Sequence, residues 1–145
     1  MYLVEGRLLK TTMYQPSNIT EQTAIHKELE TMQAFLEAQY SSDIPAAVMD
    51  RFNDLAIYMA RSGKLKADAE WHYNSLVESA LMTALKRAHQ QTMSASTLNK
   101  YIESLARDAK YLVTWADRVN RSCTHQHDGL RSVISSLRAE MMAQR

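Results

Sequence analysis

The stretch "LARDAKYLVTWADRVNRSCTHQHDGL", Leu105 to Leu130, decides the fold, because its apolar residues recur at alternating steps of four and three. That spacing places apolar side chains on one face of an α-helix. The alternation continues on both sides of the stretch and comprises twelve positions in all, of which eleven are apolar. The positions are Leu98, Ile102, Leu105, Ala109, Leu112, Ala116, Val119, Cys123, Gln126, Leu130, Val133 and Leu137. No proline interrupts them, so the sequence predicts one very long, coiled-coil-like C-terminal helix over residues 97–145.

A heptad seam of this length requires a partner helix, which in coiled coils often belongs to another subunit. We do not expect a small monomer to bury so long a stripe in its own core, and we therefore predict a homo-oligomer. Small side chains at one heptad position, Ala109, Ala116 and Cys123, would let the partner helices approach closely. The predicted interface residues are Leu105, Ala109, Leu112, Ala116, Val119, Cys123, Gln126, Leu130 and Leu137.

The rest of the chain predicts three helices of moderate length. Only three glycines and two prolines occur among the 145 residues, which disfavours turn-rich β folds. In the first helix, steps of four, three and four residues place four apolar side chains on one face, which we predict to point inward. They are Ile25, Leu29, Met32 and Leu36. The three helices are predicted at Glu21–Tyr40, Pro45–Arg61 and Leu65–Gln90, with a break or bend at Gly63. The predicted fold class is all-α, a single domain over 1–145 with an N-terminal arm (1–19), three helices within 20–92 and the long helix.

The polar run over residues 120–129 raises the question of a reactive or metal-binding site. Cys123 lies on the apolar seam, where a free cysteine behaves as a small hydrophobic residue. His125 and His127 are two residues apart and point about 200° apart on a helix, so they cannot share one metal ion. His125 and Asp128 have a suitable spacing, but a third ligand would have to come from elsewhere. We therefore predict no metal and no cofactor.

Two interpretations of this run stay open. It is either a solvated polar patch or a determinant of assembly or partner binding, in which Gln126 can fix the register or the oligomeric state. The sequence contains no nucleophile elbow, no glycine-rich phosphate loop and no C-x-x-C pair, and it does not indicate an enzyme. It also shows no signal peptide and no run near the ~20 apolar residues of a membrane span. Because the single cysteine fits a reducing compartment, we expect a soluble cytoplasmic protein with no membrane partner.

Charge is distributed unevenly along the chain. Residues 1–50 carry three Lys/Arg against seven Asp/Glu, whereas residues 51–145 carry fourteen against nine. Cations also occur near aromatic residues such as Trp71 and Tyr73, and proteins bind single-stranded DNA with this combination. The candidate DNA-binding residues are Arg61, Lys64, Lys66, Lys86 and Arg87.

Three segments carry a resemblance to a known family: "NDLAIYMARSGKLKADAEWH", the helix ending "ALKRAHQQ", and "DGLRSVISSLR" in the long C-terminal helix. In order and pattern they are similar to the UvsY recombination mediators of tailed phages, over about residues 48–138. Those proteins are small and helical, assemble into rings, bind single-stranded DNA and help to load a RecA-like recombinase onto DNA coated by single-strand-binding protein. The resemblance implies that Lys86 and Arg87 match the DNA-contact cluster, with Lys64 and Lys66 as further candidates, in a bacterial or phage-infected cell.

The leading hypothesis is thus a non-enzymatic, oligomeric mediator that binds single-stranded DNA and contacts a recombinase or single-strand-binding protein. The alternative is a helical structural or assembly scaffold that binds a protein partner. The two differ in what the cations do. Free cations around Lys64 and Lys86 favour DNA, whereas lysines held in ion pairs with Asp68, Glu70 or Glu78 favour the scaffold.

Overall fold

The computed structural model describes residues 16–88 and 93–145, and within these ranges all regular structure is helical. The three helices are α1 (Gln22–Glu37), α2 (Pro45–Ala88) and α3 (Ala95–Ala143). The prediction of an all-α fold is confirmed. Most of the predicted N-terminal arm (1–15) and the predicted end of the third helix at Gln90 lie outside the described residues.

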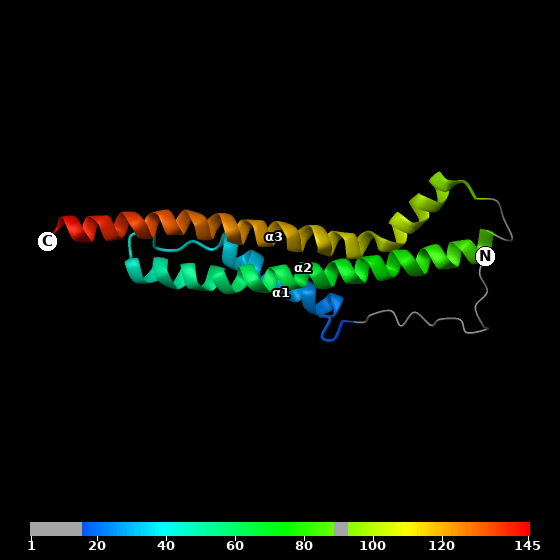
Figure 1. The fold of residues 1–145 in the computed structure, drawn as a ribbon, viewed down its shortest axis with the longest axis horizontal. Coiled ribbons are helices and arrows are strands. Elements are labelled where there is room, and N and C mark those ends of the chain that lie inside the picture. The colour runs from blue at the N-terminus through cyan, green and yellow to red at the C-terminus, as the bar shows by residue number, and fades with distance from the viewer. Residues whose placement is uncertain (1–15, 89–92) are drawn as a thin grey trace, which may run out of the picture.

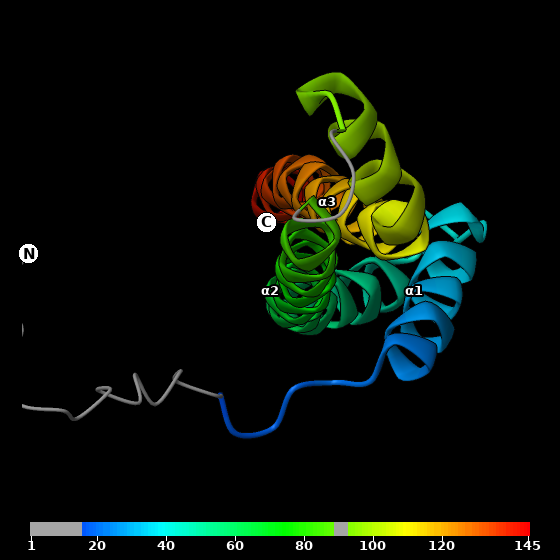
Figure 2. The same cartoon turned by 90° about the vertical axis from the view of Figure 1, so that its right-hand side faces the viewer.

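Helices α2 and α3 lie side by side and antiparallel over most of their length, forming one elongated hairpin (Figure 1). They contain 44 and 49 residues, so each is on the order of 70 Å long at 1.5 Å per residue. The shorter α1, of 16 residues, packs against one side of the hairpin and contacts both long helices (Figure 2). The first turns of α3 tilt away from α2 (Figure 1).

The predicted break at Gly63 is wrong, because α2 continues through it from Pro45 to Ala88. One glycine costs a helix only about 1 kcal/mol relative to alanine, and packing against α3 offsets that cost. Ser62 is fully buried, and Nδ2 of Asn120 donates hydrogen bonds of 2.9 Å to the Ser62 hydroxyl and to the carbonyl oxygen of Met59. The helices predicted at Pro45–Arg61 and Leu65–Gln90 are therefore parts of one helix.

The core is a single cluster in which all three helices take part. The face of α1 predicted from its spacing, Ile25, Leu29, Met32 and Leu36, is buried against the hairpin. The other buried apolar residues of this cluster are Val48, Leu55, Leu65 and Ala69 from α2, and Leu112, Ala116, Val119, Cys123 and Leu130 from α3. Complete burial of a leucine or isoleucine side chain stabilises the fold by about 1.5–3 kcal/mol. The orientation of α1 thus follows from its apolar face.

The seam on α3 finds its long partner helix within the same chain. Six of the nine predicted interface residues are buried in the monomer, namely Ala109, Leu112, Ala116, Val119, Cys123 and Leu130. Gln126 and Leu137 are half-buried, and Leu105 is 51% exposed. Because α2 does not break at Gly63, it is long enough to cover the stripe, and burial of these six residues requires no second subunit.

No helix within residues 16–88 or 93–145 carries a stretch that is both long and apolar enough to cross a membrane.

Replacement of Gly63 by alanine is expected to raise the free energy of unfolding by about 0.5–1 kcal/mol, because alanine favours the helix. Its Cβ would lie 3.7 Å from Nδ2 of Asn120, which is an ordinary contact. Urea denaturation followed by circular dichroism measures the change. Gly129→Ala in α3, where an added Cβ meets nothing within 4 Å, is the matched control. If Gly129→Ala raised the free energy of unfolding while Gly63→Ala lowered it, the result would contradict a continuous α2.

Candidate functional site

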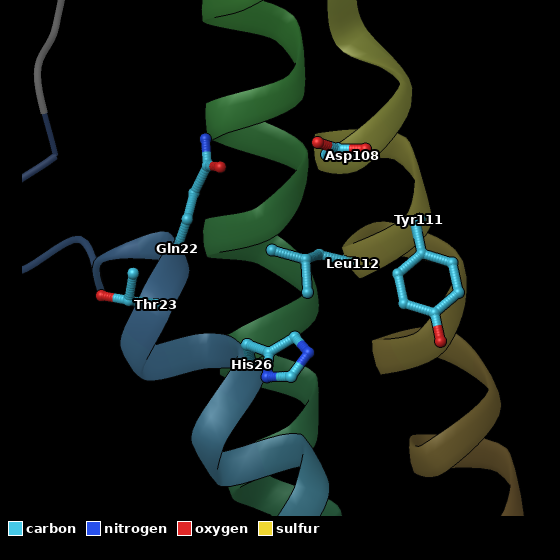
Figure 3. Close-up of a pocket in the computed structure, with 6 residues that line it drawn as sticks. All are labelled: Gln22, Thr23, His26, Asp108, Tyr111 and Leu112. Atoms are coloured by element: carbon cyan, nitrogen blue, oxygen red, sulfur yellow. The ribbon is translucent and has the colours of Figure 1, made fainter.

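A shallow groove of about 470 Å³ lies between the start of α1 and the first half of α3 (Figure 3). Its lining residues are Gln22, Thr23, His26, Asp108, Tyr111 and Leu112. None of these six side chains forms a hydrogen bond with another of the six, and Figure 3 shows them spread around the groove. The ring of His26 instead meets Trp115 edge-on at 5.3 Å between centroids. The groove does not assemble an acid–base pair or a nucleophile with its base.

The polar run over residues 120–129 joins α3 to the other two helices. Asn120 bonds to α2, and Nε2 of Gln126 donates to the carbonyl oxygen of Leu36 at the end of α1, at 3.0 Å. His127 is buried and stacks on Phe52 with ring centroids 4.0 Å apart. Within the ranges that the structure describes, no three His, Cys, Asp or Glu side chains cluster as metal ligands would.

Cys123 is fully buried in the seam. Burial raises the pKa of its thiol, because the low dielectric of the core disfavours the charged thiolate. A thiol of this kind is a poor nucleophile, since the thiolate is the reactive form.

Three of the five candidate DNA-binding cations form ion pairs within the chain. Arg61 makes a two-pronged contact with Glu28 of α1, with Nε at 2.6 Å from Oε2 and Nη2 at 2.5 Å from Oε1. Nζ of Lys66 lies 2.8 Å from Oδ1 of Asp117 on α3. The hydrogen bond from Arg61 holds the pKa of Glu28 below its usual value, and Lys66 lowers the pKa of Asp117 in the same way. These cations hold helices together and face carboxylates.

The third paired cation, Lys64, belongs to a cluster that fixes the segment leading into α1. It donates to the buried carboxylate of Asp68, which also accepts the backbone N–H of Thr20 at 3.0 Å. Nε2 of His72 lies 2.8 Å from the carbonyl oxygen of Thr20. Burial alone would raise the pKa of Asp68, but the hydrogen bonds from Lys64 and Thr20 outweigh it and lower the pKa.

The remaining two candidates, Lys86 and Arg87, lie exposed in the last turn of α2. Neither forms an ion pair with a carboxylate in the part of the chain that the structure describes. Beside them on α2 lie Leu81, Met82 and Leu85, which are 39%, 53% and 52% exposed. We call these three residues the end patch. The structure therefore separates the five candidates into three that are paired and two that lie beside an apolar surface.

Sequence reasoning missed Arg51, a buried cation on the inward face of α2. Its spacing was informative, because Arg51 follows the buried Val48 by three residues and precedes the buried Leu55 by four. An arginine within such a stripe must either reach the surface or find acceptors inside the fold. The partners of Arg61 and Lys66 were also missed, because Glu28 and Asp117 are distant in sequence.

Comparison of the chain with protein-family models, with curated proteins and with solved structures finds no match. The similarity to UvsY mediators therefore remains an expectation from the sequence pattern.

Native protein should react very slowly with a thiol-specific disulfide reagent, because Cys123 is buried and its thiol pKa is raised. The release of the coloured thiolate, followed with and without urea, measures the rate. Reaction should become fast only when the chain unfolds. Rapid stoichiometric labelling under native conditions would show that the seam around Cys123 is open.

Acid should destabilise the fold, because the pKa values of Glu28, Asp68 and Asp117 are lowered in the folded state. As the pH falls below the ordinary carboxyl range near about pH 4, the unfolded chain binds protons first, and stability is lost through the lower folded-state pKa values. Asp68→Asn should flatten part of this dependence and lower the free energy of unfolding at neutral pH by about 1–3 kcal/mol. Urea denaturation at several pH values measures both effects.

The matched control for Asp68→Asn is Asp54→Asn, which changes an exposed carboxylate of the same helix. It should leave the stability at neutral pH unchanged. Equal effects of the two substitutions would show that the cluster around Thr20 contributes nothing specific.

Proposed function

We propose that the chain is a non-enzymatic helical scaffold that associates with a second copy of itself through the end patch. The observation that carries this proposal is the exposure of Leu81, Met82 and Leu85 in adjacent turns of one helix. Neighbouring Ala80 and Ala84 are buried, so they form the inward face of α2 at this end, and the three residues of the end patch lie outside it. Contiguous apolar side chains left outside such a face are typical of protein interaction sites.

The shape of the hairpin at this end supports association. The first turns of α3 tilt away from the last turns of α2 (Figure 1). The heptad seam, by contrast, is mostly covered within the monomer and offers little to a partner. Self-association is therefore assigned to the outward side of α2 and not to the seam of α3.

The charges around the end patch favour a second copy as its partner. Glu78 precedes Met82 by four residues and Lys86 follows it by four, so all three share one helix face. In a two-fold antiparallel pairing of two α2 helices centred on Met82, Glu78 of each copy would face Lys86 of the other. A two-fold interface needs such a self-complementary surface.

A second candidate function is the binding of single-stranded DNA, as in a UvsY-like mediator that contacts a recombinase or single-strand-binding protein. The exposed Lys86 and Arg87 favour it, because neither forms an ion pair with a carboxylate of the described residues and both are open to phosphate groups. The pairing of Arg61, Lys64 and Lys66 disfavours it. Two cations per chain predict a salt slope of log affinity of only about −1.4 per subunit for a single strand.

The test combines light scattering, which gives the mass in solution, with anisotropy of a fluorescent oligothymidine at low and high salt. Leu81→Gln/Leu85→Gln should reduce the mass of wild type to that of a monomer, because it removes the apolar contact. Met141→Gln/Met142→Gln, which changes two exposed methionines at the other end of α3, should leave the mass unchanged. A monomeric wild type at every concentration would refute the scaffold proposal.

The DNA arm uses Lys86→Ala/Arg87→Ala, with Arg107→Ala as the control because Arg107 is an exposed cation on α3. Salt-sensitive binding that the double substitution removes without changing the mass in solution, and that Arg107→Ala retains, would support the second candidate. Formation of an oligomer that does not bind the oligothymidine at low salt would support the scaffold and contradict the second candidate.

A further inference from the structure

A second surface, at the opposite end of the hairpin, is built around Arg51. This side chain is 6% exposed. Its Nη2 donates to the carbonyl oxygens of Phe35 at 3.0 Å and Leu36 at 3.3 Å, and to Oε1 of Gln126 at 2.8 Å. The guanidinium also lies over the rings of Phe35 and Tyr40, 4.4 and 4.5 Å from their centroids. Arg51 thus fastens the end of α1, whose carbonyl groups carry partial negative charge.

The charge of Arg51 is nevertheless incompletely balanced. It forms no ion pair with any carboxylate of residues 16–88 or 93–145. Its Nε is buried and has no hydrogen-bond partner, which adds to the cost of burying the charge, and Nη1 forms no hydrogen bond with those residues and is the donor left for a ligand. A helix C-terminus supplies only about half a negative charge, and a buried cation without a counter-ion is costly. The site has donors and positive charge to offer to an anion.

A groove of about 590 Å³ opens beside this guanidinium. Its lining residues are Leu36, Ala38, Gln39, Tyr40, Ser42, Arg51, Gln126, Gly129, Leu130 and Val133. The aliphatic members give it an apolar wall, and Ser42 and Gln39 add polar groups. At Gly129 an added Cβ would meet nothing within 4 Å, so the missing side chain leaves room on the α3 side.

We propose that this groove binds the C-terminal carboxylate of a partner polypeptide, together with the apolar side chain of its last residue. Arg51 is the one cation among the lining residues, and a carboxylate is a monoanion that matches its single charge and planar donors. A phosphate group carries more charge and would leave it unbalanced in an apolar groove. This site is independent of the end patch and of self-association.

Substitution of Arg51 alone cannot test the proposal, because the contacts with Phe35 and Leu36 also hold α1 in place. The useful variant is Gly129→Leu, which fills the groove without removing any hydrogen bond of Arg51. It replaces a glycine inside α3 by a residue that favours the helix, so the protein should fold. Ser132→Leu, one turn further along α3 at an exposed position outside the groove lining, is the matched control.

The experiment follows the Nε–Hε resonance of Arg51 by NMR in the full-length ¹⁵N-labelled protein, assigned with Arg51→Lys. The probe is 4-methylpentanoate, compared with its neutral isostere 4-methylpentanamide and with inorganic phosphate at constant ionic strength. We expect saturable shifts with the carboxylate at about millimolar concentration, as suits a ligand of this size. Binding should be at least ten-fold weaker for the amide and for Gly129→Leu, and unchanged for Ser132→Leu.

Three outcomes would overturn the proposal. The first is the absence of a saturable shift up to about 50 mM carboxylate, well above the affinity expected for so small a ligand. The second is equal binding of the amide, or of the carboxylate by Gly129→Leu, which would show an unspecific effect. The third is tighter binding of phosphate than of the carboxylate. None of these depends on whether the protein self-associates.

Discussion

The long antiparallel contact between α2 and α3 is the feature on which the rest of the structure depends. A helix of 49 residues with a continuous apolar stripe is stable only beside a partner of similar length, and α2 supplies 44 residues. Small buried side chains such as Ala109, Ala116 and Cys123 allow the two helices to approach closely. The apolar residues of α1 then pack against the hairpin, so its position is a consequence of the pairing.

Polar contacts give this pairing its register, because a heptad stripe alone would tolerate sliding by whole heptads. Asn120 reaches the carbonyl oxygen of Met59, and one helical turn away Lys66 pairs with Asp117. A displacement of α3 by one turn would break both contacts and leave the buried Ser62 without Asn120. The polar run on α3 thus fixes the register of α3 against α2. The cations Arg61, Lys64 and Lys66, which the sequence suggested as DNA-binding residues, act as structural links.

The periodic features of the fold could be predicted from the sequence, and features that depend on distant residues could not. The buried faces of α1 and α3 followed from spacing, because helical periodicity is a local property. Gly63 was misleading, since its local helix cost is small beside the packing that α3 adds to α2. The pairing of Lys64 with Asp68 is visible at a spacing of four, whereas Lys66–Asp117 and Arg61–Glu28 join residues on different helices. Because these three cations are paired with carboxylates, only Lys86 and Arg87 of the candidate DNA-binding residues carry no ion pair in the described part of the chain.

The ion pairs in the middle of the hairpin lie between the two surfaces that we propose for partners. The end patch and the groove at Arg51 are on the order of 50 Å apart along α2, at 1.5 Å for each of the residues from Arg51 to Leu85. The groove contains the cation Arg51, to which we assign an anion, whereas the patch is apolar. At this distance across a rigid, continuous helix, the two would be occupied without competition. If both proposals hold, the stiff helix pair would keep the two partners at this distance.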